Sequence, residues 1–165
     1  MLKATHKHQN VPSTVELSST ARFLLNRKQV WTDTYIGDLP DIWIEHIAHQ
    51  GHFLIHTTRY PHAVLNSNRI LKPEIGQKYV SMTRSPAFAE YWADNNRPDD
   101  EGMAAHLILD KNKLQHSYKI ETFCDPWNQP DGATGEHRYE SEERIAQDVF
   151  PLMDVLHGVV FVKDK

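Results

Sequence analysis

The apolar residues of this chain come in short runs, and the length of these runs limits the folds open to it. Four of them read HFLIH, KYVSM, MAAHLIL and GVVFV, at residues 52–56, 78–82, 103–109 and 158–162. Such runs, with turn-forming residues close by, are typical of β-strands. None approaches the ~20 apolar residues that a membrane-spanning helix needs. We therefore predict strands in these four places and no association with a membrane.

Two helices are predicted between the first three strands. Tyr60-Pro61 opens one that ends near residue 69, and Ser85-Pro86 opens the other, with proline at the first helical position and Ser85 as its cap. In the second helix Phe88, Tyr91 and Trp92 are expected to lie in the core. This mixture of helices and short strands predicts an α+β fold with a curved or split, mainly antiparallel sheet rather than a doubly wound one.

The N-terminal part of the chain predicts helices. One helix is expected over residues 13–25, capped by its first two residues, or a shorter one capped by Ser19 or Thr20. Residues 41–50 predict a second helix that ends at a glycine. We therefore expect residues 1–49 to form a helical extension of the core.

The second half of the chain carries weaker signals. We expect a turn or helical corner at 110–114, a strand at 117–121, a long loop at 125–137 and a strand at 139–145. A loop of that length usually has a function, such as closing over a ligand.

Composition narrows the classes of protein. The 165 residues suit one domain, and the single cysteine, Cys124, excludes an intrachain disulfide and a cysteine-based zinc site. A net charge of −4 disfavours a nonspecific nucleic-acid binder. The first ten residues lack the apolar stretch of a signal peptide, which predicts a cytoplasmic protein. Neither a GxGxxG nor a GxxxxGK[ST] pattern is present, so a nucleotide would not be held by these loops.

Polar side chains end two of the predicted strands and begin a third. His56-Thr57-Thr58 follows one apolar run, Ser81-Met82-Thr83-Arg84 ends another, and Glu140-Ser141-Glu142-Glu143 opens the strand at 139–145. Imidazole and hydroxyl groups can hydrogen-bond a ribose. A carboxylate beside an anomeric carbon stabilises the positive charge that develops when a glycosidic bond breaks. If the three strands are neighbours, these groups can form one site.

The order of these pieces resembles the ADP-ribosyltransferase-like superfamily over residues 50–162. The pieces that carry the resemblance are HTT at 56–58, RILKP at 69–73, YVSMT at 79–83, PAFAEYWA at 86–93 and ESE at 140–142. The chain is also similar to small phage-encoded proteins that share the strings S-x-T-R, L-D-x-x-K-L, Y-K-I-E and E-E-R. The resemblance implies a split, mainly antiparallel sheet with flanking helices, NAD as the cofactor, and transfer of ADP-ribose to a macromolecule.

The resemblance also implies roles for the residues at the strand ends. His56, with Thr57 and Thr58 beside it, would bind the adenosine-side ribose of NAD. Ser81 and Thr83 would line the nicotinamide side. The guanidinium of Arg84 would suit the pyrophosphate.

The implied catalytic residue is Glu142, which would hold the nicotinamide ribose and activate the acceptor. Glu143 is the alternative, because a strand alternates its faces and the register cannot be fixed from the sequence. Glu140 and the acidic balance favour a protein acceptor, such as a host factor if a phage encodes the chain. The second motif departs from the family, since it reads Ser-Met-Thr-Arg rather than Ser-Thr-Ser or a tyrosine.

Other interpretations of the same residues stay open. Arg84 could pair with an acid on a neighbouring strand, and the acidic run could be a solvated face. The chain could be an inactive transferase-like protein that inhibits a host factor by contact, with Trp31, Tyr35, Trp43 and Trp127 as anchors. A related fold transfers 2′-phosphate from RNA, for which Arg59, Arg69 and Arg84 are candidates. His46 and His49 would share a helix face and could bind a metal, although no carboxylate completes a known motif.

Overall fold

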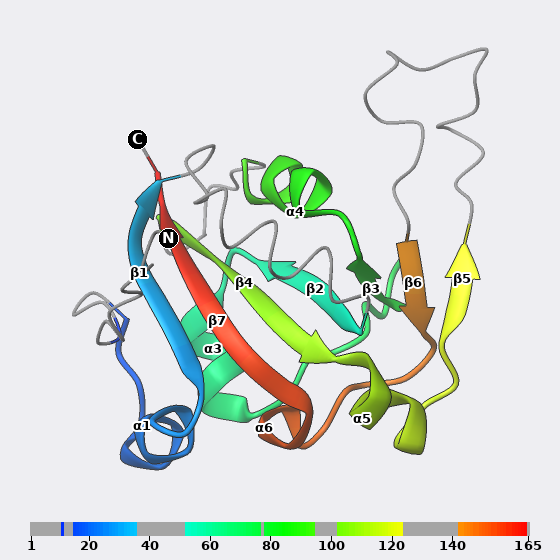
Figure 1. Cartoon of the computed structure of the whole chain (residues 1–165), viewed down its shortest axis with the longest axis horizontal. Coiled ribbons are helices and arrows are strands. Elements are labelled where there is room, and N and C mark those ends of the chain that lie inside the picture. Colours follow the sequence, from blue (N-terminus) through cyan, green and yellow to red (C-terminus); the bar gives the residue numbers. More distant parts are fainter. Residues whose placement is uncertain are drawn as a thin grey trace, which may run out of the picture.

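The computed structural model describes residues 11, 15–35, 52–76, 78–94, 102–123 and 142–164. Its strands are β1 (Gln29–Tyr35), β2 (Phe53–Thr58), β3 (Val80–Thr83), β4 (Met103–Asp110), β5 (Glu121–Phe123), β6 (Glu142–Ile145) and β7 (Leu156–Lys163). Its helices are α1 (Ser19–Leu25), α3 (Pro61–Ser67), α4 (Pro86–Ala93), α5 (Lys111–Ser117) and α6 (Leu152–Val155). Figure 1 shows how these elements are arranged.

The described strands form one mixed sheet in the order β1-β7-β4-β2-β3-β6-β5. Strands β1 and β7 are parallel, and every other neighbouring pair in this sheet is antiparallel. The predicted α+β class and the mainly antiparallel sheet are therefore confirmed. The sheet is continuous rather than split, but it narrows at one junction: β2 pairs with β4 along its whole length and with β3 only through Ile55 and Thr83.

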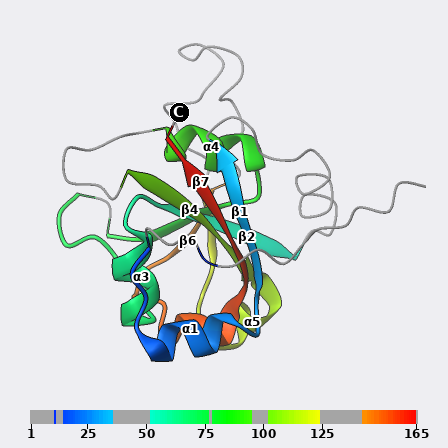
Figure 2. The same ribbon diagram turned by 90° about the vertical axis from the view of Figure 1, so that its left-hand side faces the viewer.

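The two faces of the sheet bury different amounts of apolar surface. The larger buried cluster contains Leu54, Leu107 and Phe161 from the sheet, with residues of α1, α3, α5 and α6 packed on them. The smaller cluster lies on the opposite face under α4 and contains Ile55 and Ile108. Adjacent residues such as Leu54 and Ile55 belong to different clusters because successive side chains of a strand point to opposite faces. Figures 1 and 2 both show α4 well apart from the other four helices.

Helix α4 forms where the sequence predicts it. The Ser85 hydroxyl accepts a hydrogen bond from the Phe88 amide, and Pro86 occupies the first helical position. Ala89 and Ala93 are fully buried, so their small side chains bring the helix close to the sheet. Phe88 is buried as expected, but Tyr91 and Trp92 are about half exposed, which corrects the prediction that they belong to the core.

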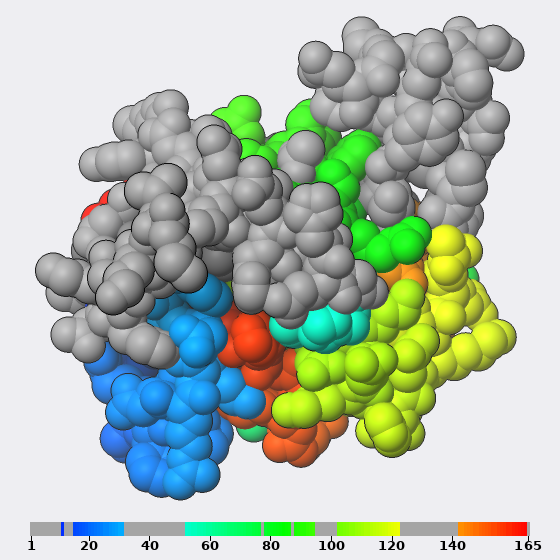
Figure 3. Space-filling view, in the orientation of Figure 1, coloured from blue at the N-terminus to red at the C-terminus, as the bar shows by residue number. Residues whose placement is uncertain are grey.

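The N-terminal segment contains a strand that the sequence analysis did not predict. Of the two alternatives predicted for the first helix, the shorter one forms, as α1. Its cap is Ser18 rather than Ser19 or Thr20. Val15 lies ahead of that helix and is buried in the larger cluster outside any helix. After α1 the chain continues into β1, which joins the edge of the sheet beside β7. In Figure 3 the blue N-terminal and red C-terminal residues accordingly meet on one surface.

The segment after β4 also differs from expectation. Asp110 caps α5 by accepting a hydrogen bond from the Lys113 amide, and the fully buried Leu114 fixes the helix on the core. The helix therefore extends to Ser117, and the strand predicted at 117–121 begins only at Glu121, as β5. The strand predicted at 139–145 is described from Glu142 onward. The helix predicted at 41–50 and the loop predicted at 125–137 lie outside the described residues.

Candidate functional site

Ser81 of β3 contacts two other residues of the predicted site, one on each neighbouring strand. Nδ1 of His56 lies 2.8 Å from the carbonyl oxygen of Ser81. Because a carbonyl oxygen only accepts, Nδ1 carries the hydrogen, and in the neutral ring Nε2 is then an acceptor. Burial lowers the pKa of His56, and the hydrogen bond to Ser81 opposes this only in part. The hydroxyl of the same serine donates to Oε1 of Glu142. Ser81 thus links His56 of β2 to Glu142 of β6, through its backbone carbonyl on one side and its hydroxyl on the other. The ring of His56 leaves the face of the sheet that carries Leu54, whereas the side chains of Ser81 and Glu142 leave the opposite face.

The carboxylate of Glu142 is buried and paired with an arginine. Arg144 binds both of its oxygens, with Nε 2.9 Å from Oε1 and a terminal nitrogen 3.1 Å from Oε2. The two residues are two apart on β6, so their side chains leave the same face of the sheet. The guanidinium of Arg144 also lies 5.2 Å from the ring centroid of Tyr79. This two-point pairing fixes where the carboxylate of Glu142 points.

Glu143 leaves the opposite face of β6 and has different partners. Its Oε1 lies 2.5 Å from Nζ of Lys111, the first residue of α5. Nε of Arg84 lies 3.6 Å from the other oxygen, Oε2. The alternative that Arg84 pairs with an acid on a neighbouring strand is therefore the one the structure shows. Glu142 and Glu143 are both buried, so the interpretation of this part of the acidic run as a solvated face is wrong.

The three threonines of the predicted site have other hydrogen-bonding partners. The Thr58 hydroxyl accepts from the Tyr60 amide, and the Thr83 hydroxyl accepts from the Ser85 amide. Both contacts span two residues and stabilise the turns that lead into α3 and α4. Thr57 points to the face that α4 covers, where its hydroxyl donates to the Ala89 carbonyl at 3.3 Å.

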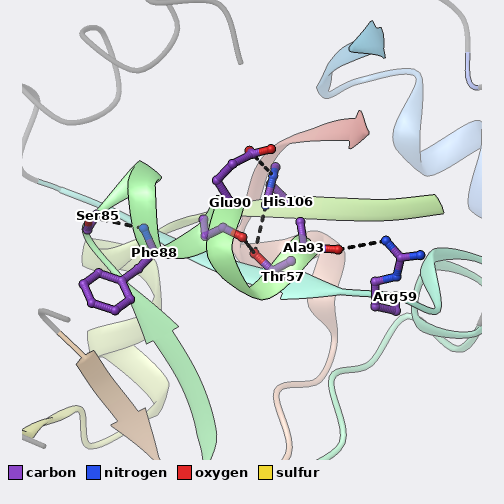
Figure 4. Close-up of polar contacts among 8 residues, drawn as sticks. Thr57, Arg59, Ser85, Phe88, Glu90, Ala93 and His106 are labelled. Carbon is purple, nitrogen blue, oxygen red and sulfur yellow. Dashed lines mark hydrogen bonds and ion pairs between the residues drawn. The ribbon is translucent and has the colours of Figure 1, made fainter. Parts of the chain in front are cut away.

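A buried histidine that the sequence analysis missed extends the contacts of Thr57 (Figure 4). The Thr57 hydroxyl lies 2.8 Å from Nδ1 of His106, and Nε2 of that ring lies 3.3 Å from Oε2 of Glu90 on α4. His106 is fully buried in the middle of β4. A histidine inside the apolar run MAAHLIL was the available signal, because a buried polar side chain needs hydrogen-bonding partners.

Arg59 fixes the end of the same helix. One terminal nitrogen donates to the Ala93 carbonyl at 2.8 Å, and both terminal nitrogens contact the carboxylate of Asp164, at 2.9 and 2.8 Å. The Arg59 side chain is buried, so these contacts replace the water that it loses on folding. Together with Thr57 and His106, Arg59 holds α4 on the sheet through polar contacts.

Several predicted features lie beyond the described residues. Glu140, His46 and His49 are among these positions, as are the possible anchors Trp43 and Trp127. Within the described part of the chain, no cluster of three or more histidine, cysteine or acidic side chains is placed to hold a metal ion. No helix in that part has the length and apolar character needed to cross a membrane.

Comparison with protein-family models, with curated proteins and with solved structures finds no match to this chain.

Proposed function

We propose that the protein transfers ADP-ribose from NAD to a macromolecular acceptor, expected to be a protein, with Glu142 as the catalytic carboxylate. The observation that carries the proposal is the chain of contacts from His56 through Ser81 to Glu142. These residues come from three separate strands and are among those that the resemblance assigns to NAD and to catalysis. An ADP-ribosyltransferase-like fold is part of the same proposal, supported by the narrow junction between β2 and β3 where these residues meet.

The residues of this chain fit the requirements of NAD in two ways. The neutral ring of His56 offers Nε2 as an acceptor for a ribose hydroxyl. Ser81 holds Oε1 of Glu142, and Arg144 holds both carboxylate oxygens, so the carboxylate needs little reorganisation to act on an anomeric carbon. When bound, NAD supplies a ribose whose bond to nicotinamide can break with the electron pair leaving on nicotinamide. Glu142 then stabilises the positive charge on the anomeric carbon and takes the proton that the acceptor releases.

The test is transfer of label from labelled NAD to protein in a cell lysate. Glu142→Gln should lower the transfer rate about 10²–10³-fold, the usual effect of removing one electrostatic contact to a transition state. Glu121→Gln is the matched control, because Glu121 is exposed on the neighbouring strand and pairs with Lys119. The proposal is wrong if calorimetry detects no NAD binding at millimolar concentration, or if Glu142→Gln transfers label as fast as the wild type.

A second candidate function is a catalytically inactive binding protein that inhibits a host factor. Two observations favour it. Arg144 engages both oxygens of Glu142, as in a structural ion pair. Tyr91 and Trp92 form an exposed edge-to-face pair on α4, with ring centroids 5.6 Å apart, and aromatic side chains are frequent anchors in protein interfaces. This candidate expects no NAD binding, and a captured partner should be lost in Tyr91→Ser/Trp92→Ser but retained in Glu142→Gln.

A further inference from the structure

Glu143 is a buried carboxylate with one oxygen that lacks a hydrogen-bond donor. Its side chain is 3% exposed, and Oε1 is held by Lys111 at 2.5 Å. Within the described part of the chain, Oε2 is buried and has no hydrogen-bond partner. Nε of Arg84 lies 3.6 Å from Oε2, which is too long for a hydrogen bond. A buried acceptor without a donor costs roughly 1–3 kcal/mol, and more when it is charged. This oxygen can therefore accept one more hydrogen bond.

The neighbours of Glu143 define the kind of ligand. Lys111 and Arg84 carry two positive charges beside Glu143, and Asp110, the cap of α5, adds a second negative charge next to Lys111. The side chain of Arg84 is 49% exposed, so its guanidinium can reach solvent while it stays beside the carboxylate. An exposed guanidinium can bind an anion, and its planar set of donors matches phosphate oxygens.

The register of the sheet places further groups beside Glu143 on the same face. Met82 of β3 and Thr122 of β5 are its cross-strand partners on either side, so both side chains leave that face. Thr122 is exposed and contributes a hydroxyl, and Met82 is buried and contributes an apolar floor. The charged groups from the packed elements are Lys111 from α5 and Arg84 from the end of β3, with Asp110 engaged as the cap of α5. In Figure 3 the strand β5 and the α5 region lie together at the right-hand side of the described surface.

We propose that Glu143, Arg84 and Lys111 form a binding site for a phosphorylated small molecule that carries hydroxyl groups, such as a phosphosugar. The phosphate binds Arg84, and a hydroxyl donates to Oε2 of Glu143. The site is separate from the carboxylate proposed for ADP-ribosyl transfer, because Glu142 and Glu143 leave opposite faces of β6. It therefore does not depend on that function. The predicted role of Arg84 in binding phosphate is kept, but on the face away from Glu142.

Calorimetry with ribose 5-phosphate, ribose and inorganic phosphate tests the site. Ribose 5-phosphate should bind at least about tenfold more tightly than either of the other two, because only it engages both Arg84 and Glu143. Arg84→Gln should weaken its binding roughly 10–100-fold, as expected for loss of a charge-assisted hydrogen bond. Arg27→Gln, which changes an exposed arginine beside Phe23, is the matched control and should bind as the wild type does.

Two variants separate this site from the proposed transferase and from a purely structural ion pair. Glu142→Gln should bind ribose 5-phosphate normally even if it abolishes ADP-ribosyl transfer. Glu143→Gln should weaken ribose 5-phosphate binding while its far-ultraviolet circular dichroism shows that the fold is retained, and if it does not fold, Arg84→Gln alone decides. The proposal is refuted if ribose 5-phosphate does not bind at millimolar concentration, if inorganic phosphate binds equally well, or if Arg84→Gln binds as tightly as Arg27→Gln. A Glu143→Gln variant that folds and binds normally refutes it as well.

Discussion

Gly158 is the position where a single added carbon should disturb the sheet most. It lies in β7 opposite Gln29 of β1, and a Cβ atom placed on it would lie 2.8 Å from the Gln29 carbonyl oxygen and 2.8 Å from Cζ3 of Trp31. Real Cβ atoms essentially never come within 3.0 Å of another heavy atom. The Trp31 ring can turn, but the carbonyl belongs to the backbone of the paired strand. We therefore expect Gly158→Ala to displace β1 from β7.

The expected cost is that of overpacking a well-packed interior, about 1–3 kcal/mol in the free energy of unfolding. A domain of this size has about 5–15 kcal/mol of stability in total, so the change is readily measured. Urea denaturation should show a lower midpoint with an unchanged slope, because the surface exposed on unfolding is the same. Trp31→Leu removes one of the two clashes, so Gly158→Ala should cost less in that background, although the clash with Gln29 persists.

Gly76→Ala is the control that separates steric clash from backbone strain. Gly76 has a positive φ of 83°, but a Cβ atom there would meet nothing within 4 Å. Its replacement should cost about 1 kcal/mol from the left-handed conformation alone, with no dependence on Trp31. The reasoning is refuted if Gly158→Ala changes stability by less than about 0.5 kcal/mol, the usual effect of a neutral surface change. It is also refuted if the cost is the same with tryptophan and with leucine at position 31.

Three further changes test other parts of the structure. Phe161→Ala should lower the free energy of unfolding by about 3–5 kcal/mol, since this fully buried ring fills the larger cluster; a loss under 1 kcal/mol in urea denaturation would contradict that packing. Asp110→Ala should cost about 1 kcal/mol through loss of the α5 cap, and Asp110→Asn should restore most of it in the same assay. Burial lowers the pKa of His56 below the ordinary 6.5, so the unfolded chain takes up a proton at a higher pH than the folded protein does. The stability is therefore complete above about pH 6.5 and is lost as the pH falls toward the pKa of His56 in the folded protein. The stability difference between the wild type and His56→Gln, measured by urea denaturation from pH 8 to 5, should therefore shift against the wild type below about pH 6.5, and a constant difference would contradict the assignment.

Local signals were enough to predict the elements whose structure is decided locally. Ser85 and Pro86 predict α4 because a serine cap and a proline at the first position act through their nearest neighbours. The apolar runs at β2, β4 and β7 predict strands because most residues of each are buried. By contrast, β1 (QVWTDTY) carries a mixed pattern, and its place in the sheet depends on β7, which lies more than a hundred residues later. Sequence patterns do not report a partner at that distance.

The candidate site was predictable in its residue types but not in its geometry. The order of the motifs brought out His56, Ser81 and Glu142, and Ser81 does contact both of the others. It could not assign faces, because a shift of one residue in β6 exchanges Glu142 with Glu143. It also could not show that the hydroxyls of Thr58 and Thr83 stabilise turns, since each contact depends on the local path of the backbone. His106 was missed because its partners, Thr57 and Glu90, come from two other elements.

The position of β7 has a consequence for biosynthesis. This strand lies between β1 and β4, so residues 156–163 separate the earliest strand from the rest of the sheet. While a ribosome is still extending the chain toward these residues, β1 lacks the neighbour that it has among the described strands, and the edge of β4 that β7 will cover is open. The strand β1 therefore cannot join the rest of the sheet until this segment has been made. During that delay a chaperone could shield the exposed edge of β4.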